Sequence, residues 1–396
     1  MNFDDALAAQ KDLVGVSLVT ELRESRWLSE ATGGDVRLKC ENLQRTGSFK
    51  IRGAYTRMAR LTEAERAAGV VAASAGNHAQ GVALAAQLLG IDATIYMPEG
   101  AALPKVQATL GYGARVELAG LDVSGALLAA QERAHATNAT FIHPYDHEDI
   151  VAGQATVGLE IIEQFAHVDT IVVPMGGGGL AAGICLLKER YPHVEIVGVQ
   201  AEAAAAWPLA LAHGAPRHAN LGLTMADGIA VADPGNVPFD VIRDRIDRVI
   251  TVTEESMSRA LIGLLERSKL LVEPSGATSV AALLQHPDEF GGNVVPILSG
   301  GNIDALLLLE VIRHGLASAG RFMMFRVRIT DRPGELMRLL TELAAKDVNI
   351  LNVNHDRGSE KLGIGEVEVA MQVATRGPEH RESVRAHLLA LGYELY

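Results

Sequence analysis

Short apolar runs alternate along most of the chain with longer segments whose apolar residues recur at helical spacing. The runs have the length of buried strands and the intervening segments have the length of helices. The predicted strands lie at 36–42, 69–74, 92–98, 114–120, 139–144, 169–175, 195–202 and 293–301. Apolar strands separated by helices are typical of a parallel sheet with helices on both faces. The pattern therefore predicts an α/β fold.

The pattern changes after 316–321, a segment of mostly small residues that follows a predicted helix at 302–314. The order beyond it is strand, helix, strand, strand, helix and strand, at 322–329, 335–346, 349–357, 366–375, 378–391 and 393–396. This βαββαβ order within about 75 residues is typical of a ferredoxin-like unit. We therefore predict a large domain at 1–315, a linker at 316–321 and a small domain at 322–396.

Length, composition and charge narrow the class of protein. A chain of 396 residues has room for two or three domains, and 48% hydrophobic with 21% charged residues is ordinary for a soluble protein. The net charge is −13 and no basic tract is present, so nucleic acids and anionic membranes are poor candidate partners. The chain also lacks an apolar stretch of about 18 residues that would predict a membrane span.

The cysteines and the first residues bear on the compartment. Cys40 and Cys185 stand far apart and outside any CxxC pattern, which argues against a disulfide framework and a cysteine-rich zinc site. The N-terminal segment is acidic and lacks the apolar stretch of a secretion signal. We therefore predict a soluble protein of the cytoplasm.

Lys50 has an unusual local context within TGSFKIRGAY at 46–55. A glycine-containing turn and the aromatic Phe49 precede it, and a helix-like run follows it. A lysine amine becomes a nucleophile near neutral pH only when its surroundings lower its pKa or when it is held as an imine. Most lysines are solvated surface charges, so Lys50 alone indicates little. Three other segments add weight to it.

Three glycine-containing turns each follow a predicted strand, where a parallel sheet presents its carboxyl ends. They are SAGNHAQG at 74–81, PMGGGGLAAG at 174–183 and SGGN at 299–302. Ligands of such folds bind at this edge. Four glycines that open a helix leave backbone amides free to hold a phosphate, although a merely tight turn would look the same. The loop lacks the GK[ST] ending of a P-loop.

Asn77 and Ser299 each offer a neutral polar group at these turns. The Asn77 amide can donate to a ring oxygen, and the Ser299 hydroxyl can face a pyridine nitrogen without keeping a proton on it. A neutral partner makes the ring a weaker electron sink, which favours loss of a β-substituent. Either residue could instead be a helix N-cap. Together with Lys50 and the glycine loop, they predict a pyridoxal-phosphate site.

In this order and spacing, SFKIRGAY, SAGNHAQG, MGGGGL and SGGN resemble the motifs of fold-type II pyridoxal-phosphate enzymes, most closely the threonine/serine dehydratases, or threonine ammonia-lyases. The resemblance covers roughly residues 5–315 and implies two α/β subdomains like those of tryptophan synthase β, the smaller at about 41–145. Residues 322–396 resemble an ACT domain, a small-ligand sensor, through the DRPGEL turn and the order of elements. The layout is similar to that of medium-length threonine ammonia-lyases with one ACT domain.

The resemblance implies a role for each matching position. Lys50 would bind the cofactor covalently and later take the α-proton of the amino-acid substrate. The other cofactor contacts would come from Phe49, Asn77, Gly176, Gly177, Gly178, Gly179, Leu180, Gly228 and Ser299. The substrate carboxylate would be held by Ser74, Ala75, Gly76, Asn77 and His78. The implied reaction removes the β-hydroxyl and then ammonia from L-threonine or L-serine, leaving a 2-oxo acid.

Two departures from the related serine racemases bear on the chemistry. Ala75 stands where those enzymes usually have a serine that transfers a proton on the opposite face. Gln200 and Ala206 stand where their divalent-metal site has carboxylates, although Glu202 lies nearby. Racemisation and that metal site are therefore doubtful, and the scattered histidines predict no other metal site.

The ACT resemblance implies a ligand site near the turn after the first strand of the small domain. Its residues would be Asp331, Pro333, Gly334 and Leu336, with Asn349 and Asn352 from the next strand. We predict a branched-chain amino acid as the effector and a homodimer or homotetramer as the assembly. The unit could instead serve only in dimerisation.

Other functions remain open at this stage. A serine-preferring dehydratase would share all of these motifs. A β-replacement enzyme such as a cysteine synthase usually has a PSGSVKDR-like lysine motif, which TGSFKIRG does not match. A catalytically inactive amino-acid sensor would have no need of Lys50.

Overall fold

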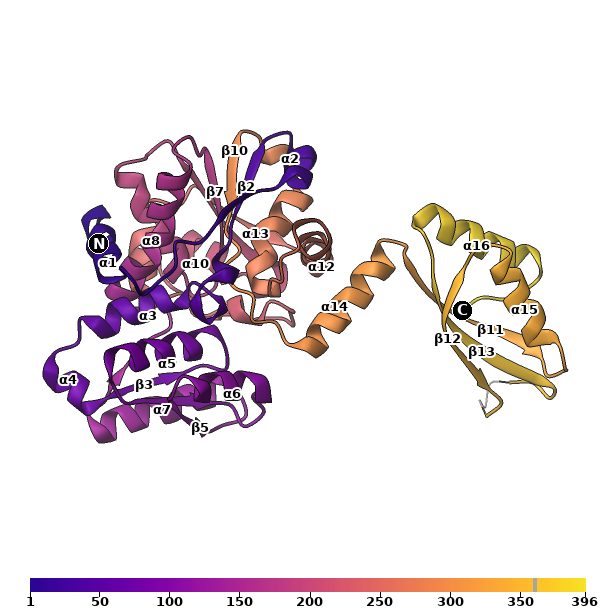
Figure 1. Ribbon diagram of the computed structural model, residues 1–396, viewed down its shortest axis with the longest axis horizontal. Helices are drawn as coiled ribbons and strands as arrows, with labels where there is room; N and C mark the ends of the chain where they lie inside the picture. Colours follow the sequence, from indigo (N-terminus) through magenta and orange to yellow (C-terminus); the bar gives the residue numbers. More distant parts are fainter. Residues whose placement is uncertain (359–361) are drawn as a thin grey trace. The chain divides into compact units, whose positions relative to one another are not determined.

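The computed structural model describes residues 1–358 and 362–396 (Figure 1). The chain forms two compact units, Met1–Leu307 and Leu308–Tyr396. Helix α14 (Ala305–Ser318) begins in the first unit and continues into the second. The segment predicted as a linker is therefore helical as far as Ser318, because leucine and alanine favour a helix there.

The larger sheet of the first unit has six strands in the order β1–β2–β10–β7–β8–β9. Their bounds are β1 (Leu22–Glu24), β2 (Asp35–Lys39), β10 (Asn293–Pro296), β7 (Thr170–Pro174), β8 (Glu195–Ala201) and β9 (Arg248–Val252). Every neighbouring pair is parallel except β1 with β2. All residues of β7 are buried, which explains its continuously apolar sequence.

Helices cover both faces of this sheet (Figure 1). Helix α13 (Pro274–Gln285) packs on β7, β8 and β9. Helix α9 (Gly179–Cys185) packs on β7 and β8, in a core with α8 (Glu148–Gln164) and α1 (Phe3–Asp12). The remaining helices of this part are α2 (Arg26–Thr32), α10 (Ala206–His213), α11 (Asn236–Ile242) and α12 (Glu254–Gly263).

The smaller sheet has four parallel strands in the order β5–β4–β3–β6. Their bounds are β3 (Val70–Ala73), β4 (Ala93–Met97), β5 (Arg115–Leu118) and β6 (Thr140–Phe141). Helices α5 (Asn77–Leu89) and α7 (Val123–Thr137) pack on it, and α4 (Glu63–Ala68) and α6 (Leu103–Gly111) flank it. Helix α3 (Lys50–Ala59) packs on both α5 and α8 and so joins the two sheets. The sheet lies within 41–145, the range implied for the smaller subdomain.

The second unit has an antiparallel sheet in the order β11–β13–β12. Its elements are β11 (Phe322–Thr330), α15 (Glu335–Ala344), β12 (Asn349–Asp356), β13 (Glu366–Ala374) and α16 (Pro378–Ala390). Leu395 adds a single bridge to Val327, beside β11. The order is that of a ferredoxin-like unit, with the predicted last strand reduced to this bridge.

Most predicted strands occur within a few residues of their expected bounds. Strand β1 was not predicted, because Leu22–Glu24 is short and mostly charged, and strand β9 was not predicted either. Among the described residues, no helix is both long and apolar enough to cross a membrane.

Candidate active site

The turn before Lys50 lies against the segment that follows β10, far away in the sequence. The Phe49 N–H donates to the Ser299 carbonyl (3.2 Å), and the Gly301 N–H donates to the Gly47 carbonyl (2.9 Å). Gly47 has a φ of 70°, which L side chains rarely adopt. This turn places Lys50 at the first residue of α3, beside the carboxyl end of the larger sheet.

The Lys50 side chain is partly buried. Its Nζ donates to the Pro144 carbonyl (3.0 Å) and lies 5.1 Å from the centre of the Phe49 ring. Burial lowers the pKa of Lys50 to about 8, and the negative charge of Glu273 opposes this shift. The amine is therefore a nucleophile closer to neutral pH than an ordinary lysine.

Asn77 is held at both ends of its amide. Its Nδ2 donates to Oε1 of Glu273 (2.6 Å), and its Oδ1 accepts from Nδ2 of Asn302 (2.7 Å). Asn302 Nδ2 also donates to the Thr46 carbonyl (2.7 Å), in the turn before Lys50. Asn77 therefore has a fixed orientation at the start of α5, as an amide donor to a ring oxygen requires.

Glu273 and Asn302 were not assigned a role from the sequence. Glu273 precedes Pro274, where an acidic residue at a helix start is common. The signal that could have identified it is its position in the apolar run LLVEPSGA, which predicts burial of a carboxylate. Asn302 stands in the SGGN motif, but its partners come from distant segments.

The glycine loop fits closely under two aromatic side chains. A Cβ on Gly177 would lie 2.4 Å from the Tyr145 ring, and one on Gly178 would lie 2.2 Å from Cζ2 of Trp207. Gly178 also has a φ of 99°. Trp207 Nε1 donates to the Gly176 carbonyl (2.7 Å), which holds the loop in place. The loop therefore presents backbone where any side chain would collide.

Gly178→Ala is expected to weaken binding of the cofactor at least tenfold, or about 1.4 kcal/mol. The added methyl group must displace Trp207, and the backbone must leave its left-handed conformation. Equilibrium dialysis of pyridoxal phosphate would measure the change. The matched control is Gly111→Ala, since a Cβ there meets nothing within 4 Å. Equal affinities of the two variants would contradict the phosphate role of the loop.

Gly228 and Leu180 occupy different positions relative to this loop. The Gly228 carbonyl lies 3.4 Å from the Cβ position of Gly176, so the predicted backbone contact is adjacent to the loop. The Leu180 side chain is buried in the core of the larger subdomain, which leaves only its backbone for the site. A Cβ on Gly228 would lie 2.9 Å from Oγ of Ser275.

The predicted carboxylate-binding residues follow β3 directly. The Gly76 N–H donates to Oγ of Ser74 (3.1 Å), which gives the loop a tight turn. His78 is buried, and its Nε2 donates to the Ile142 carbonyl (2.8 Å). Burial lowers the pKa of His78 to about 3, so its side chain is neutral and structural. Its contribution to a substrate site is limited to its backbone N–H.

Tyr145 is a third residue without a role assigned from the sequence. Its hydroxyl donates to the Asp233 carbonyl (3.1 Å), while its ring lies over Gly177. The neighbouring Asp146 accepts from the Val237 N–H (2.7 Å). The segment after β6 therefore connects the smaller subdomain to the glycine loop and supplies the carbonyl that receives Lys50.

Gln200 stands where the related racemases have a metal carboxylate, and here it supports the backbone. Its Nε2 donates to the Met175 carbonyl (3.2 Å), and its Oε1 accepts from the Trp207 N–H (2.9 Å). Ala206 is buried beside it. Within the described residues, no group of three or more His, Cys, Asp and Glu side chains could hold a metal ion.

The predicted effector residues lie on the surface of the second unit. Asp331 forms an ion pair with Arg357 (2.9 and 3.0 Å), while Pro333 and Gly334 are exposed in the turn. Leu336 packs against the core of the unit, and the exposed residues Asn349 and Asn352 belong to β12. The turn is thus open to solvent within this unit.

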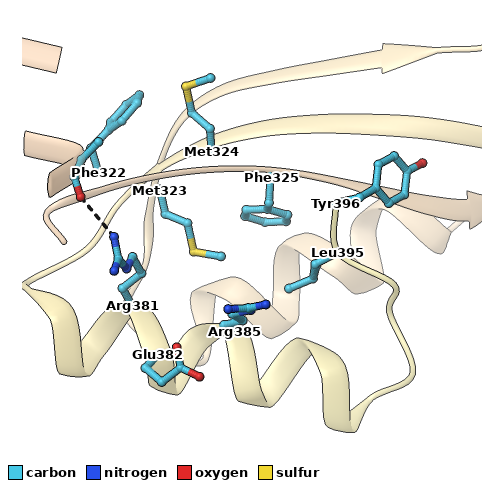
Figure 2. A pocket seen from close by; sticks show the side chains of 10 residues that line it. Phe322, Met323, Met324, Phe325, Arg381, Glu382, Arg385, Leu395 and Tyr396 are labelled. Atoms are coloured by element: carbon cyan, nitrogen blue, oxygen red, sulfur yellow. Dashed lines mark hydrogen bonds between the residues drawn. The ribbon is translucent and has the colours of Figure 1, made fainter. Parts of the chain in front are cut away.

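A pocket of ≈ 470 Å³ lies elsewhere in the second unit (Figure 2). Its lining residues are Ala317, Phe322, Met323, Met324, Phe325, Arg381, Glu382, Arg385, Leu395 and Tyr396. Figure 2 shows Met323 and Phe325 of β11 pointing toward the charged side chains of α16, whereas Phe322 and Met324 point to the other side of the strand. Arg381 Nη1 donates to the Ala317 carbonyl (3.1 Å). The pocket therefore combines an apolar wall with cationic groups.

Comparison with known proteins agrees with the geometry of the first unit. Residues 16–300 match the family described as pyridoxal-phosphate dependent enzymes. The chain belongs to this family. The match spans both sheets and includes Lys50, Asn77, the glycine loop and Ser299. The predicted cofactor, the enzyme class and the α/β fold are thereby confirmed.

Relatives of this pyridoxal-phosphate enzyme extend over the whole chain. An L-threonine ammonia-lyase of Geobacter sulfurreducens is 46% identical over 376 residues, or 94% of each chain. One of Thermotoga maritima is 43% identical over 396 residues, covering 100% of this chain and 99% of the other. The structure of processed threonine deaminase isoform 2 from Solanum lycopersicum has a TM-score of 0.75 and 33% identity, covering 79% of this chain and 94% of that chain.

The residues present fit pyridoxal phosphate. The glycine loop follows β7 directly and carries no side chains that would keep a phosphate from its backbone amides. The Lys50 amine has a lowered pKa, and Asn77 is oriented as a donor. In addition, Ser275 Oγ is buried beside Gly228 without a protein hydrogen-bond partner. The Lys50 amine, the Asn77 amide and the loop amides therefore match the aldehyde, the ring oxygen and the phosphate of the cofactor.

Proposed function

We propose that the protein is an L-threonine ammonia-lyase that converts L-threonine into 2-oxobutanoate and ammonia and also accepts L-serine. The observation that carries the proposal is the partly buried Lys50 amine with its lowered pKa, next to a turn that is hydrogen-bonded to the Ser299 segment. The names of the two relatives that match nearly the full chain support the same activity.

Each residue of the site has a distinct task in this reaction. Bound pyridoxal phosphate supplies the electron sink that makes the α-proton of the substrate acidic. Lys50 holds the cofactor and takes that proton, because its amine has a lowered pKa. Asn77 would donate to the ring oxygen, the amides of Gly176–Leu180 would bind the phosphate, and those of Ser74–His78 would hold the substrate carboxylate. Ser299 would offer the pyridine nitrogen an uncharged hydroxyl.

Ala75 favours a lyase over a racemase. Its methyl side chain cannot carry a proton to the opposite face of the substrate. A proton removed by Lys50 can therefore return only to the face from which it came. We accordingly expect little D-serine from L-serine, and we propose that a metal ion has no role at Gln200, whose amide is occupied by backbone hydrogen bonds.

The test is the release of 2-oxo acid and ammonia from purified protein supplied with pyridoxal phosphate. L-Threonine should give 2-oxobutanoate at a higher kcat/KM than the kcat/KM for pyruvate from L-serine. Pyruvate alone would move the assignment to a serine dehydratase. D-Serine formation at a comparable rate would favour a racemase, and inactivity toward both amino acids with cofactor bound would favour a β-replacement enzyme or a sensor.

We also propose that the second unit is an ACT domain and that a branched-chain amino acid binds near its first turn. The order β11–β13–β12 with two helices supports this proposal. The exposed turn at Asp331–Gly334 supports it as well, because a second subunit could cover such a surface. We propose a homodimer or homotetramer on the same grounds, and a cytoplasmic location from the two buried, unpaired cysteines.

Isoleucine, valine or leucine is expected to change the kcat/KM or the thermal stability of the wild type. The change should saturate with effector concentration, because it follows occupancy of the effector site. Asp331→Ala should abolish the response if the effector binds at the turn, whereas Arg385→Ala, in the pocket of Figure 2, should leave it intact. The reverse pattern would place the effector in the pocket. Titrations without a change in activity, assembly or melting temperature would reject regulation by these amino acids.

A further inference from the structure

Glu273 closes a chain of hydrogen bonds that begins at the turn before Lys50. The Thr46 carbonyl can only accept, so Asn302 must present its Nδ2 to it (2.7 Å). The same Nδ2 donates to Oδ1 of Asn77, which leaves the Asn77 Nδ2 directed at Glu273 (2.6 Å). That nitrogen carries two hydrogens, and Glu273 receives one of them. The second remains available for the ring oxygen of a cofactor.

The backbone of Glu273 is held by hydrogen bonds at both its N–H and its carbonyl, and its side chain packs closely against Gly300. Its N–H donates to the Gly300 carbonyl (3.0 Å), and its carbonyl accepts from Ala277 in α13 (3.0 Å). A Cβ on Gly300 would lie 2.2 Å from Oε1 of Glu273, so only glycine leaves room for the carboxylate there. The side chain is 7% exposed. Glu273 therefore reaches the site from the larger subdomain in a single arrangement.

We propose that Glu273 is a positioning residue that aims Asn77 at the ring oxygen of the cofactor and, by gaining or losing its own proton, changes the charge beside that oxygen. This inference rests on the proposed function, because it requires the cofactor at Lys50. It adds to that function a group that titrates close to the reacting centre without contacting the substrate.

The charges around Glu273 come from several elements. Burial raises its pKa to about 7, although the hydrogen bond from Asn77 lowers it. Asp227, next to the glycine loop, raises the pKa, while Lys105 of α6 and Lys50 of α3 lower it. None of these charges forms a hydrogen bond to Glu273 that would hold it in one protonation state. Its charge therefore changes across neutral pH.

The direction of the effect follows from electrostatics. When Glu273 is negative, a negative ring oxygen nearby is disfavoured, so a proton shared between that oxygen and the cofactor-bound Lys50 nitrogen would lie on the oxygen. When Glu273 is neutral, the same proton would lie on the nitrogen. The absorbance and fluorescence of the bound cofactor depend on where this proton lies. They should change with pH around a midpoint near 7.

The experiment is a pH titration of cofactor absorbance and fluorescence in the holoenzyme and its variants. Glu273→Gln preserves the shape and the hydrogen bond from Asn77, so its cofactor should remain in the low-pH form from pH 6 to 9. Asp227→Asn should shift the wild-type midpoint to lower pH, since Asp227 raises the pKa of Glu273. Glu273→Ala should weaken cofactor affinity roughly tenfold, as expected for a lost charge-assisted hydrogen bond.

Glu117→Gln is the matched control, because it removes one exposed carboxylate, on β5, that is outside the proposed site. Its titration should superimpose on that of the wild type. A Glu273→Gln titration that superimposes on the wild type would overturn the inference, and so would a wild type without any transition between pH 6 and 9. Borohydride reduction followed by mass analysis separates the two proposals. A missing adduct at Lys50 overturns the proposed function, whereas an adduct with an unchanged titration overturns only the role of Glu273.

Discussion

Lys50→Ala is expected to lower kcat for 2-oxobutanoate formation by roughly 10⁴-fold or more, since a proton-transferring group alone contributes up to about 10⁴-fold. The variant also loses the amine that holds the cofactor, so the visible absorbance of the bound cofactor should disappear. The fold should persist, because the Lys50 amine forms one hydrogen bond, to the Pro144 carbonyl. Oxo-acid release, the visible spectrum and far-ultraviolet circular dichroism measure the three effects.

Lys11→Ala is the control for Lys50, because Lys11 is exposed on α1. It should leave turnover unchanged. In the cofactor-free wild type, attachment of pyridoxal phosphate should slow as the pH falls below about 8, because the amine then becomes protonated. Near-wild-type turnover of Lys50→Ala would contradict the site assignment, and attachment that instead speeds up on acidification would contradict the lowered pKa.

The parts of the fold that could be predicted are those with a local pattern. Strands such as β7 and β8 are mostly apolar because both faces are covered, and that pattern can be recognised in the sequence without knowledge of the neighbouring strands. The division into two sheets could not be read this way, since it depends on which strands pair. The resemblance to a known family supplied it. Helix α14 extends beyond the predicted helix at 302–314, because Leu316 and Ala317 continue a helix where small residues are also typical of a linker.

The residues of the site could likewise be predicted where they stand in a local motif. Lys50, Asn77 and Ser299 stand in motifs at strand ends, and the topology of a parallel sheet predicts that such ends converge. Glu273 and Tyr145 carry no comparable local signal. Glu273 has an ordinary helix-start sequence. Its importance arises from its hydrogen bond with Asn77, which lies 196 residues earlier in the chain. Contacts of this kind are set by packing between subdomains, which one sequence does not display.

A buried cluster of charges connects α3 to the rest of the first unit. Arg52, two residues after Lys50, donates from Nε to Oε2 of Glu41 (2.8 Å) and from Nη1 to Oε1 of Glu160 (2.6 Å). Lys39 donates from Nζ to Oε2 of Glu160 (2.6 Å). The Arg52 side chain is fully buried. Removal of its charge would leave two carboxylates in the interior with a single lysine.

Arg52→Ala is expected to lower the free energy of unfolding by about 3–5 kcal/mol, the usual cost of breaking a buried ion pair. Burial by itself would raise the pKa of Glu41, but Arg52 and then Lys39 hold it below its ordinary value. The ionised Glu41 therefore stabilises the fold above its unfolded pKa of about 4.5, and this contribution is lost as the pH falls. Urea denaturation at pH 7 would measure the loss.

The expected loss of stability in Arg52→Ala depends on the burial of the ion pair, and an exposed ion pair tests that dependence. Arg26 bonds Glu30 at 2.8 Å, but its side chain is 91% exposed, so Arg26→Ala should cost less than about 1 kcal/mol. The deficit of Arg52→Ala should shrink as the pH falls below about 4.5, because the wild type then loses the contribution of Glu41. Equal stabilities of the two variants at pH 7 would show that the cluster is not a support of α3. If Arg52→Ala shows a large loss of stability and also loses the bound cofactor, the same charges hold Lys50 in place.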